Sequence, residues 1–184
     1  YVHVPSAWLS LFAYTSLFIC SVVALIWRIK VFEVLSISSA KTGALFTFLA
    51  LVTGSIWGKP MWGTWWVWDA RLTSELILLF IYISIIVLHN SFDDYRKGAK
   101  TANILAIVGF INIPIIHFSV EWWNTLHQGP SVIKFGLPSI SPEMLYPLIY
   151  VSIGFTFYFI TSIFLSARNT LLLRERNKRW VNSI

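Results

Sequence analysis

The stretch from Ala7 to Trp27, AWLSLFAYTSLFICSVVALIW, contains no Asp, Glu, Lys or Arg. As an α-helix it would be about 30 Å long, which is the thickness of the hydrocarbon core of a bilayer. Four more segments without these residues follow, at 42–58, 76–92, 101–120 and 144–167. Only 12% of the 184 residues are charged, about half the share usual in soluble domains. The sequence therefore predicts an all-α fold, a polytopic transmembrane helical bundle with five spanning helices.

The chain shows no repeat, linker or low-complexity tract, so we expect a single integral-membrane domain over residues 1–184. The first span is not expected to be a cleaved signal peptide, because no basic segment precedes it and it is too long. The chain does not begin with methionine, so upstream residues are expected. Cys20 is the one cysteine, which excludes an internal disulfide and a C-x-x-C-H motif for covalent haem attachment.

The distribution of basic residues predicts the orientation in the membrane. Lys and Arg collect in short segments on the cytoplasmic or matrix side. Segments 28–41, 93–100 and 168–184 contain eleven of them, whereas residues 1–6 and segments 59–71 and 121–143 contain three. The N-terminus is therefore predicted outside and the C-terminus inside. The net charge of +6 follows from this topology, with anionic membrane lipid as a further partner; no nucleic acid is expected to bind.

Eight of the ten tryptophans fall on the predicted outer side, and four of them lie in the motif WGTWWVWD. Interfacial tryptophans can serve only as lipid anchors, but such anchors form at both membrane surfaces. We favour a binding platform. In a surface helix, Trp62, Trp65, Trp66 and Asp69 would share one face, with Trp68 to one side. Stacked indoles of this kind suit a large planar π-system.

Two histidines from distant parts of the sequence, His3 and His127, fall on the same predicted side as this motif. Paired imidazoles are a common way to hold haem iron, although a structural role for each is the alternative. His117 is a rival ligand, for which we favour a hydrogen bond to Glu121. His89 falls on the opposite side and is not expected in the site. A zinc centre is not favoured, because no H-E-x-x-H motif is present.

The outer side has few basic residues, namely Lys59, Arg71 and Lys134. Lys59 and Arg71 flank the tryptophan motif, so either could pair with a haem propionate. The alternative is that each side chain only extends to the membrane surface. Asp69 would repel propionates, so we expect it to orient an indole N–H, cap the following helix or contact a partner.

Three separated blocks resemble the tryptophan-rich haem-handling proteins, whose motif is W-G-x-x-W-x-W-D. The blocks are YVHVPSAW, GKPMWGTWWVWDARLTSELIL and IPIIHFSVEWWNTLHQGPSV. Their order is that of the CcmC family, and the resemblance covers most of the chain. Members of that family usually have six spanning helices with both ends inside, whereas this chain shows five and is predicted to begin outside.

The resemblance implies that His3 and His127 are the axial ligands of a non-covalently bound haem b. It implies a haem-presenting surface on the tryptophan motif, and the full set of candidate haem-contacting residues is Trp62, Trp65, Trp66, Trp68, Asp69, Trp122, Trp123, Lys59 and Arg71. The partners that it implies are the haem chaperone CcmE, the ABC transporter subunits CcmA and CcmB, and the small single-span subunit CcmD.

We therefore expect a haem carrier that delivers haem to CcmE for cytochrome c maturation and is not itself an enzyme, with at most an auxiliary part in haem attachment. The expected location is the bacterial inner membrane with the site facing the periplasm, or else the mitochondrial inner membrane. One alternative is a membrane oxidoreductase with haem as a permanent redox centre, in which histidines usually lie in the middle of spanning helices. Another is a solute transporter without haem.

Overall fold

The computed structural model describes residues 1–127, 129, 139–178 and 181, and in this part of the chain it contains six α-helices and no strand. The fourth and fifth helices follow one another across two residues, so that five candidate membrane spans result, as predicted. The helices are α1 (His3–Trp27), α2 (Lys30–Trp62), α3 (Ala70–Asn90), α4 (Tyr95–Gly109), α5 (Asn112–Trp122) and α6 (Pro142–Arg174).

The second helix is much longer than the predicted span at 42–58. Segment 28–41, which the charge pattern places in a loop, lies in α2 from residue 30 onward and forms the first third of that helix. Its charges do not break the helix, because Lys and Glu are themselves good helix formers. Glu33 is buried between helices and paired with Arg96 at 3.4 Å and Arg174 at 3.6 Å.

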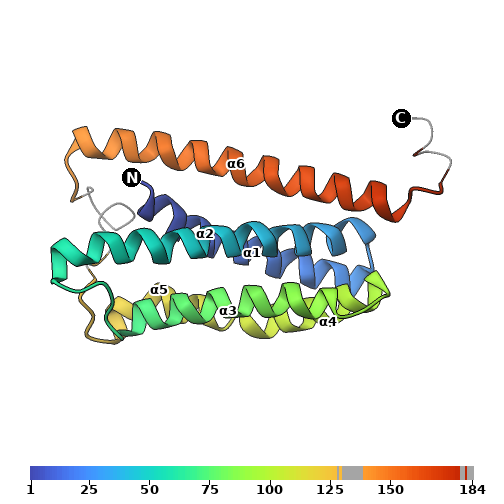
Figure 1. Cartoon of the computed structure of the whole chain (residues 1–184), viewed down its shortest axis with the longest axis horizontal. Coiled ribbons are helices and arrows are strands. Elements are labelled where there is room, and N and C mark those ends of the chain that lie inside the picture. Colours follow the sequence, from blue (N-terminus) through green and yellow to red (C-terminus); the bar gives the residue numbers. More distant parts are fainter. Residues whose placement is uncertain (128, 130–138, 179–180, 182–184) are drawn as a thin grey trace.

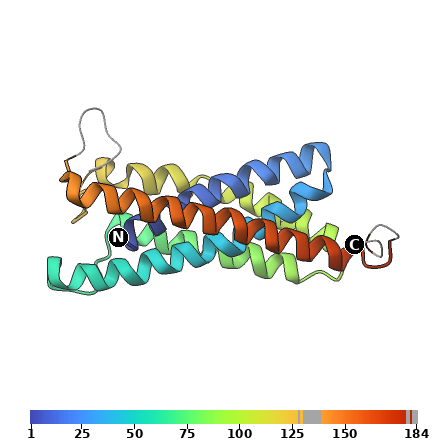
Figure 2. The same cartoon turned by 90° about the horizontal axis from the view of Figure 1, so that it is seen from above.

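Helices α1 to α4 form the body of the bundle (Figure 1). Both α1 and α3 pack against α2, and both also pack against α4, so α1 and α3 lie diagonally opposite one another. The C-terminal helix α6 runs along α2 and α1 on the outside, as both views show (Figure 2). Large apolar side chains remain exposed around the bundle, as expected of a surface that faces lipid.

One end of the bundle collects three segments that are distant in sequence (Figure 1). They are the N-terminus, the link 63–69 between α2 and α3, and the residues that follow α5. We refer to this end as the pocket end. The C-terminal end of α6 lies at the other end, together with the ion pairs of Glu33. The predicted gathering of the three segments therefore agrees with the structure.

The tryptophan motif is not a surface helix, so that prediction is wrong. The helix α2 ends at Trp62, and Gly63 adopts a left-handed conformation with a φ of 76°. Its N–H donates to the carbonyl of Lys59 at 3.0 Å, which is the usual way in which a glycine ends a helix. Residues 64–69 are then irregular until Asp69 caps α3. The glycine decides the local structure, because only glycine adopts this conformation without strain.

Candidate haem site

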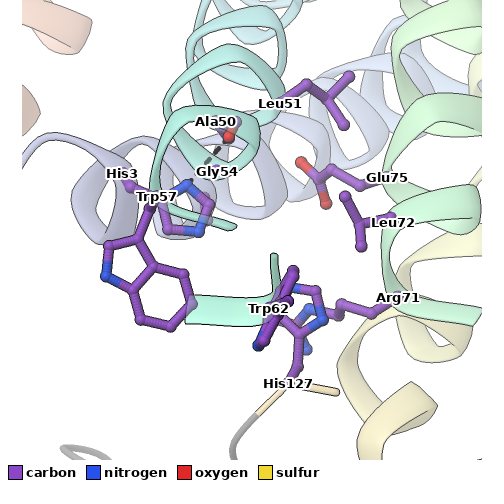
Figure 3. A pocket seen from close by; sticks show the side chains of 11 residues that line it. His3, Ala50, Leu51, Gly54, Trp57, Trp62, Arg71, Leu72, Glu75 and His127 are labelled. Carbon is purple, nitrogen blue, oxygen red and sulfur yellow. Dashed lines mark hydrogen bonds between the residues drawn. The ribbon is translucent and has the colours of Figure 1, made fainter. Parts of the chain in front are cut away.

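A pocket at the pocket end joins residues from three helices and from the segment after α5 (Figure 3). Its enclosed space is about 60 Å³, while the whole space between its side chains, open mouth included, is about 510 Å³. Small-molecule pockets usually enclose about 300–1,000 Å³, so a large planar ligand would have to extend through the open mouth. The lining residues that matter for its chemistry are His3, Gly54, Trp57, Trp62, Arg71, Glu75 and His127.

His3 is the first residue of α1, and its ring lies against α2. Its Nδ1 is 2.9 Å from the carbonyl oxygen of Ala50. A carbonyl oxygen can only accept, so Nδ1 carries the proton and Nε2 keeps its lone pair. The close approach depends on Gly54, because a Cβ at that position would lie 2.7 Å from Cε1 of the His3 ring.

His127 reaches the same pocket from the other end of the sequence, and Asp69 holds it there. The Nδ1 of His127 lies 3.2 Å from Oδ2 of Asp69. Burial lowers the pKa of His127 below its ordinary value, although the hydrogen bond and the charge of Asp69 oppose the shift. The imidazole is therefore neutral at pH 7, and the contact is a hydrogen bond donated by Nδ1 rather than an ion pair.

Asp69 thus has two functions. Its Oδ1 accepts a hydrogen bond from the backbone N–H of Leu72 at 2.8 Å, which caps the N-terminus of α3. Its Oδ2 orients His127. Capping was among the roles expected from the sequence, whereas the bond to a histidine was not. The cap fixes the carboxylate relative to α3, so the position of His127 is set by the start of that helix.

The two histidines share one chemical state. Each has its Nδ1–H engaged by an oxygen, so each Nε2 is a free electron-pair donor. Histidines that bind metal almost always donate their other ring N–H to a carbonyl or carboxylate in this way. The pair is suited to a metal centre that takes one imidazole on each side, which is the arrangement of a haem iron with two axial ligands.

Only part of the predicted aromatic platform borders this pocket. Trp62 does, and its ring lies edge-on to His127 with centroids 4.8 Å apart. Trp57 also borders it, in edge contact with Trp62 at 5.5 Å. Sequence reasoning placed Trp57 on the correct side but not in the site. The available signal was that Trp57 lies only five residues before Trp62, so that one continuous helix would bring both to the same end of the bundle.

The other tryptophans of the motif lie elsewhere. Trp65 and Trp68 are 55% and 76% exposed, and Trp66 borders a separate apolar groove between α2 and α3. Trp122 and Trp123 are also exposed, and Trp122 stacks on Phe118. The predicted single face is absent because the motif is not helical. These indoles form the outer surface of the pocket end instead of the pocket wall.

Of the two basic residues that flank the motif, Arg71 borders the pocket and Lys59 does not. Arg71 donates from Nη1 to the carbonyl of Ile116 at 3.1 Å, which holds the guanidinium between α3 and α5. Lys59 donates to the carbonyl of Gly63 at 3.0 Å. The candidate Lys134 lies outside the described residues.

The remaining histidines do not border the pocket. His117 is exposed, and its ring contacts Phe118 rather than Glu121. No hydrogen bond joins His117 to Glu121 in the structure, so that interpretation is wrong. His89 lies in the last turn of α3 at the far end of the bundle, where Nδ1 contacts Oδ1 of Asn90 at 3.0 Å.

Known proteins resemble this chain over its whole length. The family model described as heme exporter protein C matches residues 1–182. "Heme exporter protein C" of Haemophilus influenzae is 53% identical over 184 residues, which are 100% of this chain and 75% of that protein. The protein of the same name from Escherichia coli K12 is 48% identical over 100% of this chain and 74% of its own length. A "putative cytochrome c biosynthesis ccmC-like mitochondrial protein" of Marchantia polymorpha is 51% identical over 89% of this chain and 68% of that protein.

Proposed function

This chain belongs to the CcmC family of heme exporter proteins, and we propose that it binds haem between His3 and His127 and passes it to the haem chaperone CcmE. The observation that carries the proposal is the pair of imidazoles in one pocket, each with a free Nε2. They come from residues 124 positions apart in the sequence, so the folded bundle is needed to assemble them.

The other pocket residues have roles that follow from their chemistry. Trp57 and Trp62 would contact the faces or the edge of the macrocycle and exclude water from the iron. Arg71 would pair with a propionate, since a guanidinium suits a carboxylate geometrically and is already held in place by Ile116. Haem b without thioether bonds is the form that this donor set would hold, and none of these groups supplies a bond-forming step.

The exposed tryptophans provide the surface for transfer. Exposed tryptophans lie in the link 63–69 and at the end of α5, namely Trp65, Trp68, Trp122 and Trp123. Interfaces between proteins are enriched in tryptophan. The pocket has an open mouth, and a haem that extends through it would be accessible to a chaperone. A permanent redox centre would be enclosed more deeply, and His3 lies at the first turn of α1 rather than in mid-helix.

We further propose that the pocket end faces the periplasm and that the protein lies in a bacterial inner membrane. The opposite end holds the segments rich in Lys and Arg, which is the cytoplasmic signature. The relatives include both bacterial proteins and mitochondrial ones, and the mitochondrial inner membrane is the corresponding alternative. CcmA, CcmB and CcmD are the proposed companions in the membrane.

A transfer assay tests this function. The detergent-purified protein, loaded with haem, is mixed with an excess of apo-CcmE, and the two are separated before absorption spectra are recorded. We expect haem to move to CcmE from the wild type. His127→Ala is the control, and it should carry little haem into the assay. Haem that stays on the wild-type protein and undergoes rapid redox cycling with a quinone would contradict the carrier and support an oxidoreductase.

A further inference from the structure

A buried polar contact lies at the wall of the pocket that holds the two histidines. Glu75, in the second turn of α3, borders the pocket and is only 8% exposed. Its Oε1 lies 2.7 Å from the hydroxyl of Ser10 on α1, which is fully buried. A carboxyl group inside a membrane-spanning helix is costly and usually functional, so a structural explanation alone is insufficient for Glu75. Neither residue was a candidate in the sequence.

This contact joins two helices whose backbones lie apart, and the ring of Tyr14 on α1 also meets the ring of Tyr82 on α3, with centroids 5.1 Å apart. Because α2 and α4 each lie between α1 and α3, only long side chains can cross from one to the other. Tyr82 makes the second crossing, and its hydroxyl donates to the backbone carbonyl of Ser10 at 2.8 Å. It passes over Gly43 of α2, where a Cβ would clash with the tyrosine ring. Two buried hydrogen bonds, one with Glu75 and one with Tyr82, therefore connect α3 to Ser10.

Each of the two helices also positions one of the histidines. Ser10 is seven residues after His3, about two helical turns, so both lie on the same face of α1. On α3, Asp69 caps the N-terminus and holds His127, and Glu75 follows in the second turn. The contact between Ser10 and Glu75 therefore connects the helix that carries His3 to the helix whose N-terminal cap holds His127.

We propose that Glu75 is a positioning residue of the haem site, which acts through Ser10 to hold His3 and His127 at the separation that one iron requires. This inference rests on the proposed function. The bond does not depend on the protonation of Glu75: a carboxylate accepts from the Ser10 hydroxyl, while a carboxylic acid donates to it and Ser10 donates to the carbonyl of Ala7 at 2.8 Å.

The test compares four single variants, each purified, loaded with haem and examined by absorption spectroscopy and haem titration. Glu75→Leu and Ser10→Ala each remove the contact, and each should convert six-coordinate haem to a five-coordinate form with affinity lowered by about 10- to 100-fold. Glu75→Gln can still accept or donate, so it should keep the wild-type spectrum. Ser21→Ala is the matched control. It removes a buried bond from α1 to Asn103, 3.1 Å long, away from the pocket.

The outcomes separate positioning from general loosening. Equal melting temperatures for Ser10→Ala and Ser21→Ala, with an altered spectrum only in the former, would support the inference. Wild-type spectra and affinity in Ser10→Ala would overturn it, even if Glu75→Leu does not fold. Equal spectral changes in both serine variants would overturn it as well, because any loss of packing would then suffice. A wild type that takes up no haem would instead overturn the proposed function itself.

Discussion

Gly54→Ala should weaken haem binding although it adds only one methyl group. The new Cβ would lie 2.7 Å from Cε1 of His3, whereas ordinary contact begins at about 3.4 Å, so the ring must retreat by about 0.7 Å. A retreat straight from α2 would lengthen the bond from Nδ1 to the Ala50 carbonyl from 2.9 Å to about 3.6 Å. At that distance the contact is no longer a hydrogen bond.

The energetic consequence follows from that lost bond. A buried donor without its partner costs about 1–3 kcal/mol, which corresponds to roughly a 5- to 150-fold loss in affinity if the cost falls on the bound state. Replacement of glycine by alanine also favours a helix by about 1 kcal/mol, so the melting temperature should change little. Weaker binding at nearly constant stability is therefore the expected signature.

Haem titration of the purified variant, monitored by the absorption of the bound haem, measures this effect. Gly154→Ala is the matched control, because Gly154 also lies in a spanning helix and a Cβ there would meet open space. It should bind haem as the wild type does. If Gly54→Ala also binds haem with wild-type affinity and spectrum, the reasoning that Gly54 leaves room for the His3 ring against α2 is refuted.

Three more predictions concern the other parts of the site. Asp69→Ala should lower haem affinity by about 10- to 100-fold and stability by about 1 kcal/mol, whereas Asp69→Asn, which preserves the cap, should lower only the affinity; haem titration and thermal melts distinguish the two. Haem occupancy should stay full above pH 6.5 and fall only as the pH drops through the lowered pKa of His127, because protonation removes the lone pair that binds iron. A spectroscopic pH titration measures this, and haem release already above pH 6.5 would contradict the prediction. Trp62→Ala should weaken haem retention more than Trp65→Ala, since Trp62 borders the pocket and Trp65 does not. Haem loss is measured by gel filtration, and the reverse order would show that the exposed indole of Trp65 is the main contact.

Much of the fold follows from the sequence because the membrane imposes it. Apolar segments without charge must form helices in lipid, where every backbone polar group needs an internal partner. The alternation of spans then places the N-terminus, the tryptophan motif and the segment with His127 at one end of the bundle. The approach of His3 to His127 could be expected for that reason alone.

The details of the pocket could not be predicted, because they depend on close packing between helices. The helix α2 ends at Trp62 because Gly63 adopts a left-handed conformation. The aromatic residues around this glycine made the helix end hard to predict from the sequence. The contact of Trp57 with the pocket requires that α2 continue to Trp62, whereas the predicted span ends at 58. Glu75 follows the motif within a run that reads as an ordinary helix start, and its contact with Ser10 requires that α1 and α3 be placed in three dimensions.

The coordination of the bound haem tests the central claim most directly. The measurement is the absorption spectrum of the haem-loaded protein, recorded for the wild type, His3→Ala, His127→Ala and His89→Ala. We predict a six-coordinate, low-spin spectrum for the wild type and for His89→Ala, and its loss in each of the other two variants. A wild-type spectrum in either His3→Ala or His127→Ala would contradict the claim that these two imidazoles hold one iron.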